Sequence, residues 1–136
     1  MSDNHDDALL QQFEDCSMPF ERFRHRTHIQ IAFLYLRRHP VLDVLARFPE
    51  ALKRYAATHG QEGLYHETIT WAYILLINER MRRAGHAQGW VEFASTNPDL
   101  LTWTDSILKQ YYRDETLSSD LARRIFMFPD KAPALP

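Results

Sequence analysis

Apolar residues recur every three or four positions along nearly the whole of this 136-residue chain, and prolines and glycines interrupt the pattern. This period places apolar side chains on one face of an α-helix. No pair of alternating segments is joined by a hairpin turn, and no internal repeat is visible. We therefore predict an all-α fold, a single compact helical bundle of about five to seven helices spanning residues 1–136. Residues 1–5 and the Pro-rich C-terminal tail, 131–136, are predicted to be irregular.

The helix boundaries follow from prolines, glycines and capping residues. Pro49 has the features of a first-turn proline and divides the segment 41–59 into two helices. Pro98 starts a further helical stretch with a break near Trp103, and Ser118 or Ser119 caps the last helix. The predicted helices cover residues 6–17, 24–38, 41–47, 50–59, 66–83, 90–94, about 98–111, and a last segment that includes 121–126.

The composition is that of an ordinary globular domain and narrows the choice of partners. Because the net charge is −2, no general attraction to nucleic acid or to anionic lipid is expected. Cys16 is the only cysteine, which excludes an intrachain disulfide and Cys-rich zinc modules. The start of the chain lacks the pattern of a secretory signal, and no apolar run is long enough to cross a bilayer. We expect a bacterial-type cytoplasmic protein whose partner is a small-molecule ligand.

Three of the seven histidines have the spacing of a small metal site. His25 and His28 share one face at the start of the most apolar helix, and His66 opens a second long helix after a glycine-containing loop. Neutral imidazole is the commonest protein ligand for zinc, iron and copper, and helical bundles bind metals with side chains projecting inward from facing helices. We predict that His25, His28 and His66 bind one divalent transition metal: iron, zinc or copper.

Glu67 is the candidate for acid–base catalysis beside this site, and Glu62 is a further candidate. Three imidazoles with one open position match catalytic zinc, whereas an added carboxylate suits non-haem iron or manganese. An enzyme of this kind would be a metal-dependent hydrolase or lyase, or an oxygen-using oxidoreductase, acting on a small molecule. Both glutamates also have structural interpretations, Glu67 as a first-turn acid near the helix dipole and Glu62 as a solvated loop residue.

Two other interpretations of the histidines stay open. In the first, the protein is a metal-free binding module that holds a small acidic ligand between the histidines and an inward-facing Arg123. In the second, it is a structural or interaction subunit whose histidines form hydrogen bonds in the core, because a buried imidazole must satisfy both ring nitrogens. Anionic metabolites would stabilise the binding module against unfolding, and metal ions would stabilise the metalloprotein.

Five short motifs occur together between about Phe20 and Asp130. They are Phe23-x-His25-x-x-His28-Ile29, Ala32-Phe33-x-Tyr35-Leu36, Tyr65-His66-Glu67-Thr68-Ile69-Thr70, Tyr111-Tyr112, and Leu117-x-Ser119-x-x-Ala122-Arg123-x-x-Phe126-x-x-Pro129-Asp130. In this combination the chain resembles a family of small bacterial all-helical proteins, mostly labelled uncharacterised. The resemblance implies that the positions of His25, His28 and His66 recur as family hallmarks, which favours a shared site for them. It implies no particular activity.

Overall fold

Seven α-helices and four short 3₁₀ helices form the computed structural model of the chain, which describes residues 2–131. The α-helices are α1 (Ser2–Glu14), α2 (His25–Arg38), α3 (Val41–Thr58), α4 (Glu67–Arg83), α5 (Trp90–Thr96), α6 (Asp114–Leu117) and α7 (Asp120–Arg124). The 3₁₀ helices are η1 (Phe20–Arg22), η2 (Glu62–Leu64), η3 (Pro98–Leu100) and η4 (Ile107–Gln110). No strand occurs within residues 2–131, so the predicted all-α bundle is confirmed. The predicted irregular tail lies, apart from Lys131, outside the described residues.

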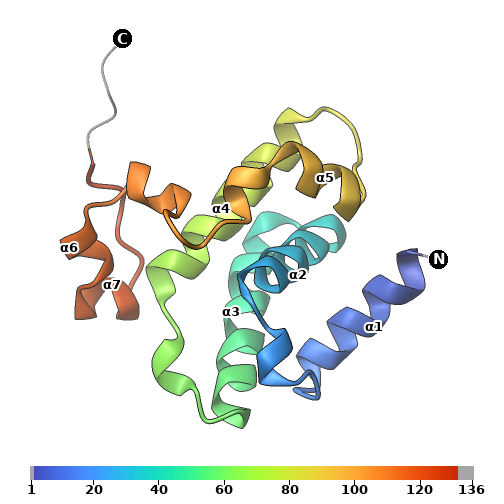
Figure 1. The fold of residues 1–136 in the computed structure, drawn as a ribbon, viewed down its shortest axis with the longest axis horizontal. Helices are drawn as coiled ribbons and strands as arrows, with labels where there is room; N and C mark the ends of the chain where they lie inside the picture. The colour runs from blue at the N-terminus through green and yellow to red at the C-terminus, as the bar shows by residue number, and fades with distance from the viewer. Residues whose placement is uncertain (1, 132–136) are drawn as a thin grey trace.

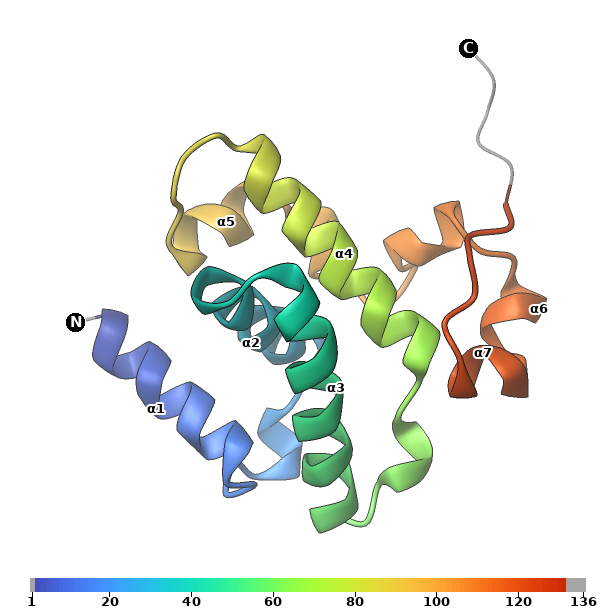
Figure 2. The same ribbon diagram turned by 180° about the vertical axis from the view of Figure 1, so that it is seen from behind.

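The helices α2, α3 and α4 pack against one another at the centre of the bundle (Figure 1). The helix α1 covers α2 and α3 at one end of the molecule, and α5 packs against α2. At the opposite end, α6 and α7 lie beside the start of α4, as the reverse view in Figure 2 also shows. This arrangement brings the beginning of α2, the beginning of α4 and the C-terminal helices close together.

The core is built around α2, which is buried on most sides, as its continuous apolar run predicts. Residues 31–36 of this helix are all buried. Beside it, the rings of Phe13, Phe23, Phe48 and Tyr55 form an aromatic cluster in which neighbouring centroids are 4.9–5.6 Å apart. Each helix in residues 2–131 falls short of the combined length and apolarity that a membrane span requires.

The structure shows that the predicted break at Pro49 is wrong. Helix α3 runs through Pro49 from Val41 to Thr58 as one element. A proline inside a helix removes one backbone hydrogen bond and adds a steric cost. The apolar stripe continues on both sides of it, however, with Val44 and Phe48 before Pro49 and Leu52 after it all buried in the core. Burial of this stripe offsets the local cost, so one helix forms where two were predicted.

The segment that follows α5 also differs from the prediction. Residues 98–111 do not form a helix broken only near Trp103; the two 3₁₀ helices η3 and η4 flank an irregular stretch, 101–106. Asp105 in this stretch has a positive φ of 58°, which is incompatible with a right-handed helix. The hydroxyl groups of Tyr73 and Ser106 are hydrogen-bonded at 2.6 Å and tie the stretch to α4.

The structure also differs from the prediction near both ends of the chain. Helix α1 begins at Ser2, so residues 2–5, predicted as irregular, are helical. Ser119 caps α7 as predicted, but α7 ends at Arg124, and Ile125 is extended, with φ −133° and ψ 159°. This extended backbone lets the Thr68 hydroxyl donate to the Ile125 carbonyl and accept from the amide of Met127. The tertiary contact with Thr68 therefore ends α7 at Arg124, although the apolar period in the sequence continues to Phe126.

Candidate functional site

The three predicted histidines line one cavity of about 450 Å³, together with Arg123. His25 and His28 lie in the first turn of α2, and His66 is the residue that caps α4. Arg123 comes from α7, at the other end of the chain. Among the described side chains, those of residues 4–131, no aspartate or glutamate lines this cavity. Apart from the hydroxyl groups of three tyrosines, its titratable lining therefore consists of three imidazoles and one guanidinium.

The ring of His28 packs against two phenyl rings. The Phe23 ring stacks on it at a centroid distance of 5.8 Å, and the Phe48 ring stacks on it at 5.3 Å. Burial lowers the pKa of His28 to about 3, and the charge of neighbouring His25 acts in the same direction. The imidazole is therefore neutral at physiological pH, with one nitrogen that donates and one that accepts.

The two ring nitrogens of His28 have no hydrogen-bond partner within the described part of the chain. They are also not fully buried. In that part, the one fully buried side-chain polar atom without a partner is Oδ1 of Asn78. The His28 nitrogens therefore keep access to the cavity that the ring lines. A neutral donor–acceptor pair of this kind is free to bind a ligand.

His25 has one ring nitrogen occupied and one free. Its Nε2–H donates to the carbonyl of Leu100 at 2.9 Å, which leaves Nδ1 as an acceptor. The ring also contacts Tyr73 edge to face, at a centroid distance of 5.0 Å, and Trp103 at 5.3 Å. Burial lowers the pKa of His25, while the bond to Leu100 opposes the shift. His25 therefore also favours the neutral form, with its acceptor available.

His66 uses both ring nitrogens for structural hydrogen bonds. Its Nε2–H donates to the carbonyl of Leu117 at 2.7 Å, and its Nδ1 accepts from the backbone N–H of Ile69 at 3.1 Å. The second bond makes it the N-cap of α4, and the first connects α4 to α6. Burial lowers the pKa of His66, and the charge of Arg123 adds to that effect. To coordinate a metal, His66 would have to lose one of these bonds.

The metal centre predicted from the three histidines stays a prediction. Among the side chains that the structure describes, those of residues 4–131, no three histidines, cysteines, aspartates or glutamates are grouped as ligands for one ion. The rings of His25 and His28 are 6.4 Å apart between centroids, and these two still have free nitrogens. The structure therefore brings the three positions to one cavity, where only His25 and His28 have ring nitrogens without a hydrogen-bond partner.

The two predicted acid–base residues lie outside the cavity lining. The Glu67 carboxylate accepts a hydrogen bond from the Tyr65 hydroxyl at 2.5 Å, in the first turn of α4. Glu62 is exposed in η2. Both positions match the structural interpretations, a first-turn acid and a solvated loop residue. Glu67 is connected to the cavity only through Tyr65, which lines it, so its predicted catalytic role has no direct contact with the cavity to support it.

Arg123 is the cation of the site. It is half-buried on α7, and its guanidinium donates to the carbonyl of Gly63 in η2, shortly before α4. This bond holds the side chain at the cavity and leaves further N–H groups for a ligand. The inward-facing Arg123 considered from the sequence is therefore where the binding-module interpretation requires it.

Six aromatic rings complete the lining, and the sequence had not singled them out for this role: Phe20, Phe23, Tyr55, Tyr65, Tyr73 and Trp103. Their spacing resembles that of core residues, and several are indeed part of the core. Trp103 is the exception, because its side chain is 54% exposed at the cavity edge. The sequence carries no signal for this position, because residues 25 and 103 are far apart in the chain and only the fold brings the two rings to a centroid distance of 5.3 Å.

We compared the chain with protein-family models, with curated proteins and with solved structures, and none of the three comparisons found a match.

Proposed function

We propose that the protein is a metal-free binding module for a small organic anion, held in the cavity between His28 and Arg123. One observation carries this proposal: a neutral imidazole with both nitrogens unpaired lies in the same cavity as a guanidinium, and no carboxylate competes for either within the described residues. Ligand sites of this size combine an apolar lining with a few polar groups that fix orientation.

The lining indicates the chemistry of the ligand. Aromatic rings favour a flat or compact apolar body that packs against them. A guanidinium forms its best hydrogen bonds with a carboxylate, through two parallel N–H groups. The neutral His28 can donate to, or accept from, a hydroxyl, amide or second carboxyl group. A small aromatic or branched aliphatic carboxylate with one further polar group meets these three requirements.

The lowered pKa of His28 favours ligand binding over acid–base catalysis. A general base works best when its pKa lies near the operating pH, and an imidazole with a pKa of about 3 is a weak base at neutral pH. Glu67, the other predicted catalytic group, does not line the cavity. His28 is therefore better suited to recognise a polar group by hydrogen bonding than to remove a proton from it.

A thermal-unfolding screen with a panel of aromatic and aliphatic carboxylates tests this function. A ligand at about a hundred times its Kd should raise the free energy of unfolding by about 2.7 kcal/mol, and the matched neutral amide should act more weakly. Replacing Arg123→Gln or His28→Phe should abolish the stabilisation. The variant Arg124→Gln is the matched control, because the Arg124 guanidinium is exposed and paired with Asp120; it should respond as the unaltered protein does.

The same screen with zinc, iron(II) and copper(II) distinguishes the binding module from a metal centre formed by the histidines. The proposal predicts no specific stabilisation by these ions, whereas a metal centre predicts a large one that His25→Ala or His28→Ala removes. Stabilisation by a metal, together with no response to any carboxylate, would contradict the binding module and favour the metalloprotein.

A further inference from the structure

The ring of His25 presents a hydrogen-bond acceptor of fixed position to the histidine cavity. The carbonyl oxygen of Leu100 can only accept a hydrogen bond, so the proton of the neutral ring is on Nε2, 2.9 Å from that oxygen. Nδ1 is therefore an acceptor, and within the described residues it has no partner and is not fully buried. Leu100 belongs to η3, which Arg80 of α4 holds through hydrogen bonds to Asn97 and Asp99, each at 2.8 Å. The fold thus determines which nitrogen of His25 remains free for a ligand.

His28 can supply a donor close to this acceptor. The centroids of the two imidazole rings are 6.4 Å apart, so one oxygen atom can lie within hydrogen-bond distance of a nitrogen of each ring. Because neither nitrogen of His28 has a partner in the described part of the chain, its proton can be on whichever nitrogen faces that oxygen. Ether and carboxylate oxygens only accept, and an ammonium group only donates, whereas a hydroxyl group does both. A hydroxyl is therefore the group that matches the two rings together.

The rings beside His25 indicate which carbon skeleton carries this hydroxyl. Tyr73 contacts the imidazole edge to face at a centroid distance of 5.0 Å, and Trp103 lies at 5.3 Å. A ligand with a hydroxyl at His25 places the adjoining carbon atoms near Tyr73 and Trp103, where an aromatic ring packs well. Water would form the same hydrogen bonds but would leave the Trp103 side chain 54% exposed. A phenolic group combines the hydroxyl with the ring.

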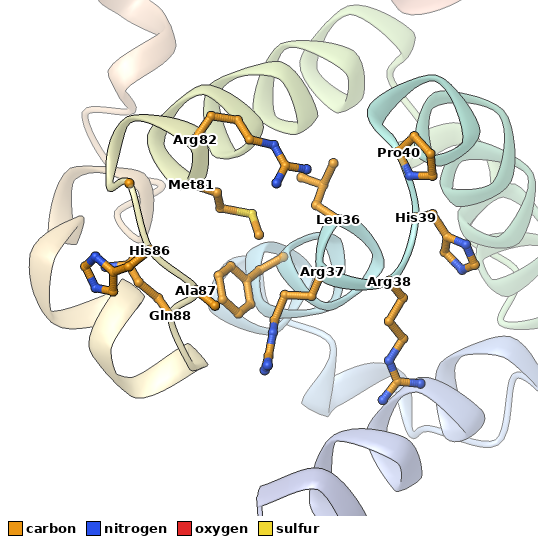
Figure 3. A pocket seen from close by; sticks show the side chains of 12 residues that line it. Leu36, Arg37, Arg38, His39, Pro40, Met81, Arg82, His86, Ala87 and Gln88 are labelled. Carbon is orange, nitrogen blue, oxygen red and sulfur yellow. The ribbon is translucent and has the colours of Figure 1, made fainter.

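The larger hollow of the protein has no comparable convergence of polar groups. It measures about 830 Å³ and lies between the C-terminal ends of α2 and α4 (Figure 3). The guanidinium groups of Arg37 and Arg82 point in different directions on either side of Leu36. Arg37 also lines a separate hollow with Asp6 and Asp7. No single ligand group can contact both arginines, so the histidine cavity is the better candidate for specific recognition.

We infer that the ligand of the histidine cavity is an aromatic carboxylate with a phenolic hydroxyl, and that His25 selects the hydroxyl by accepting a hydrogen bond from it at Nδ1. This inference rests on the function proposed above, in which Arg123 binds the carboxylate, and it adds the chemical class of the ligand. A phenolic hydroxyl keeps its proton at neutral pH and can therefore donate. A ligand without a donor would cover Nδ1 and leave it unpaired, which costs binding free energy.

Isothermal titration with meta- and para-hydroxybenzoate, with their methyl ethers and with benzoate tests this specificity. At neutral pH, at least one hydroxybenzoate should bind the intact chain at least about tenfold more tightly than both its methyl ether and benzoate. The ether keeps the oxygen but has no donor, and benzoate lacks the donor without added bulk. The two comparisons together separate hydrogen bonding from steric fit. The ortho isomer is unsuitable, because its hydroxyl would donate to its own carboxylate.

Three variants assign the roles of the residues. His25→Phe keeps a ring beside Trp103 but has no acceptor, so it should lose the preference for the hydroxyl. His59→Phe is the matched control, because Nε2–H of His59 likewise donates to a backbone carbonyl, that of Cys16 at 3.0 Å, but His59 does not line the cavity. This control should keep the preference. Arg123→Gln should weaken the binding of a hydroxybenzoate and of its ether by the same factor, because both carry the carboxylate.

Nitrogen NMR of the histidine rings gives a second readout in the intact chain, which does not depend on the folding of His25→Phe. The Nδ1 signal of His25 should move toward that of a hydrogen-bonded nitrogen when the preferred hydroxybenzoate is added, and not when its ether is added. Equal affinities for hydroxybenzoates and ethers, both weakened by Arg123→Gln, would overturn this inference and leave the proposed function standing. A preference for the hydroxyl that persists in His25→Phe would overturn the role of His25. If no carboxylate binds, the inference and the proposed function both fail.

Discussion

Replacing Phe13 by alanine is expected to lower the free energy of unfolding by about 3 to 5 kcal/mol, the range for a large aromatic removed from a packed core. Phe13 is fully buried in α1. Its ring stacks on Phe23 and on Phe48, each at a centroid distance of 5.6 Å. Those two rings also stack on His28, so the cavity left by Phe13→Ala should loosen the histidine site as well. Urea unfolding at neutral pH measures the loss.

Phe128→Ala is the matched control, because the Phe128 side chain is 82% exposed. This variant should differ from the unaltered protein by no more than about 0.5 kcal/mol. A cost below about 1 kcal/mol for Phe13→Ala would contradict the packing described here, since it would mean that α1 does not hold the aromatic cluster in place.

Stability should fall as the pH is lowered below about 6.5, and His28 should be a main cause. The pKa of its ring is lowered from 6.5 to about 3 in the folded chain, so below pH 6.5 the unfolded chain takes up a proton that the folded chain does not. At about pH 5 this difference amounts to about 2 kcal/mol. The variant His28→Phe keeps a ring packed against Phe23 and Phe48 but does not titrate. Between about pH 7.5 and pH 5 it should lose about 2 kcal/mol less stability than the unaltered protein.

The variant His86→Gln is the control, because the pKa of His86 is shifted in the opposite direction to that of His28. His86 is exposed and hydrogen-bonded to Glu92, which raises its pKa. Its contribution to stability is therefore present at low pH and is lost as the pH rises. Removing it should not protect the protein against acid. If His28→Phe loses as much stability on acidification as the unaltered protein, His28 is not held neutral in the way described here.

The long, strongly periodic helices were predictable from the sequence because their own apolar faces determine them. The central helix, α2, is the clearest case, since its continuous apolar run requires burial on most sides. The errors lie where a tertiary contact outweighs a local signal. Burial of the stripe around Pro49 keeps α3 whole, and the bonds from Thr68 to residues 125 and 127 end α7 early. The stripe of Val44, Phe48 and Leu52 is visible in the sequence as an unbroken period of four across Pro49, whereas the contacts of Thr68 leave no local trace in it.

The sequence was enough to suggest which histidines share a cavity, but not which of their ring nitrogens are free to bind a ligand. The spacing of His25 and His28 and the position of His66 at a helix start were enough to suggest one shared cavity, which the structure contains. The hydrogen-bond partners of the rings were not predictable, because they are backbone carbonyls far away in the chain: Leu100 for His25 and Leu117 for His66. Those partners decide which nitrogens remain free, and so favour a binding site over a three-histidine metal centre.

The most direct test of this account is an NMR pH titration of the histidine rings, with the His28 signals assigned by their loss in His28→Phe. The account predicts that the His28 ring is still neutral at about pH 5, while exposed His86 has already gained its proton. A titration midpoint for His28 near its ordinary value of 6.5 would contradict it, because the ring would then lie in bulk water and not in the aromatic cavity that the proposed function requires.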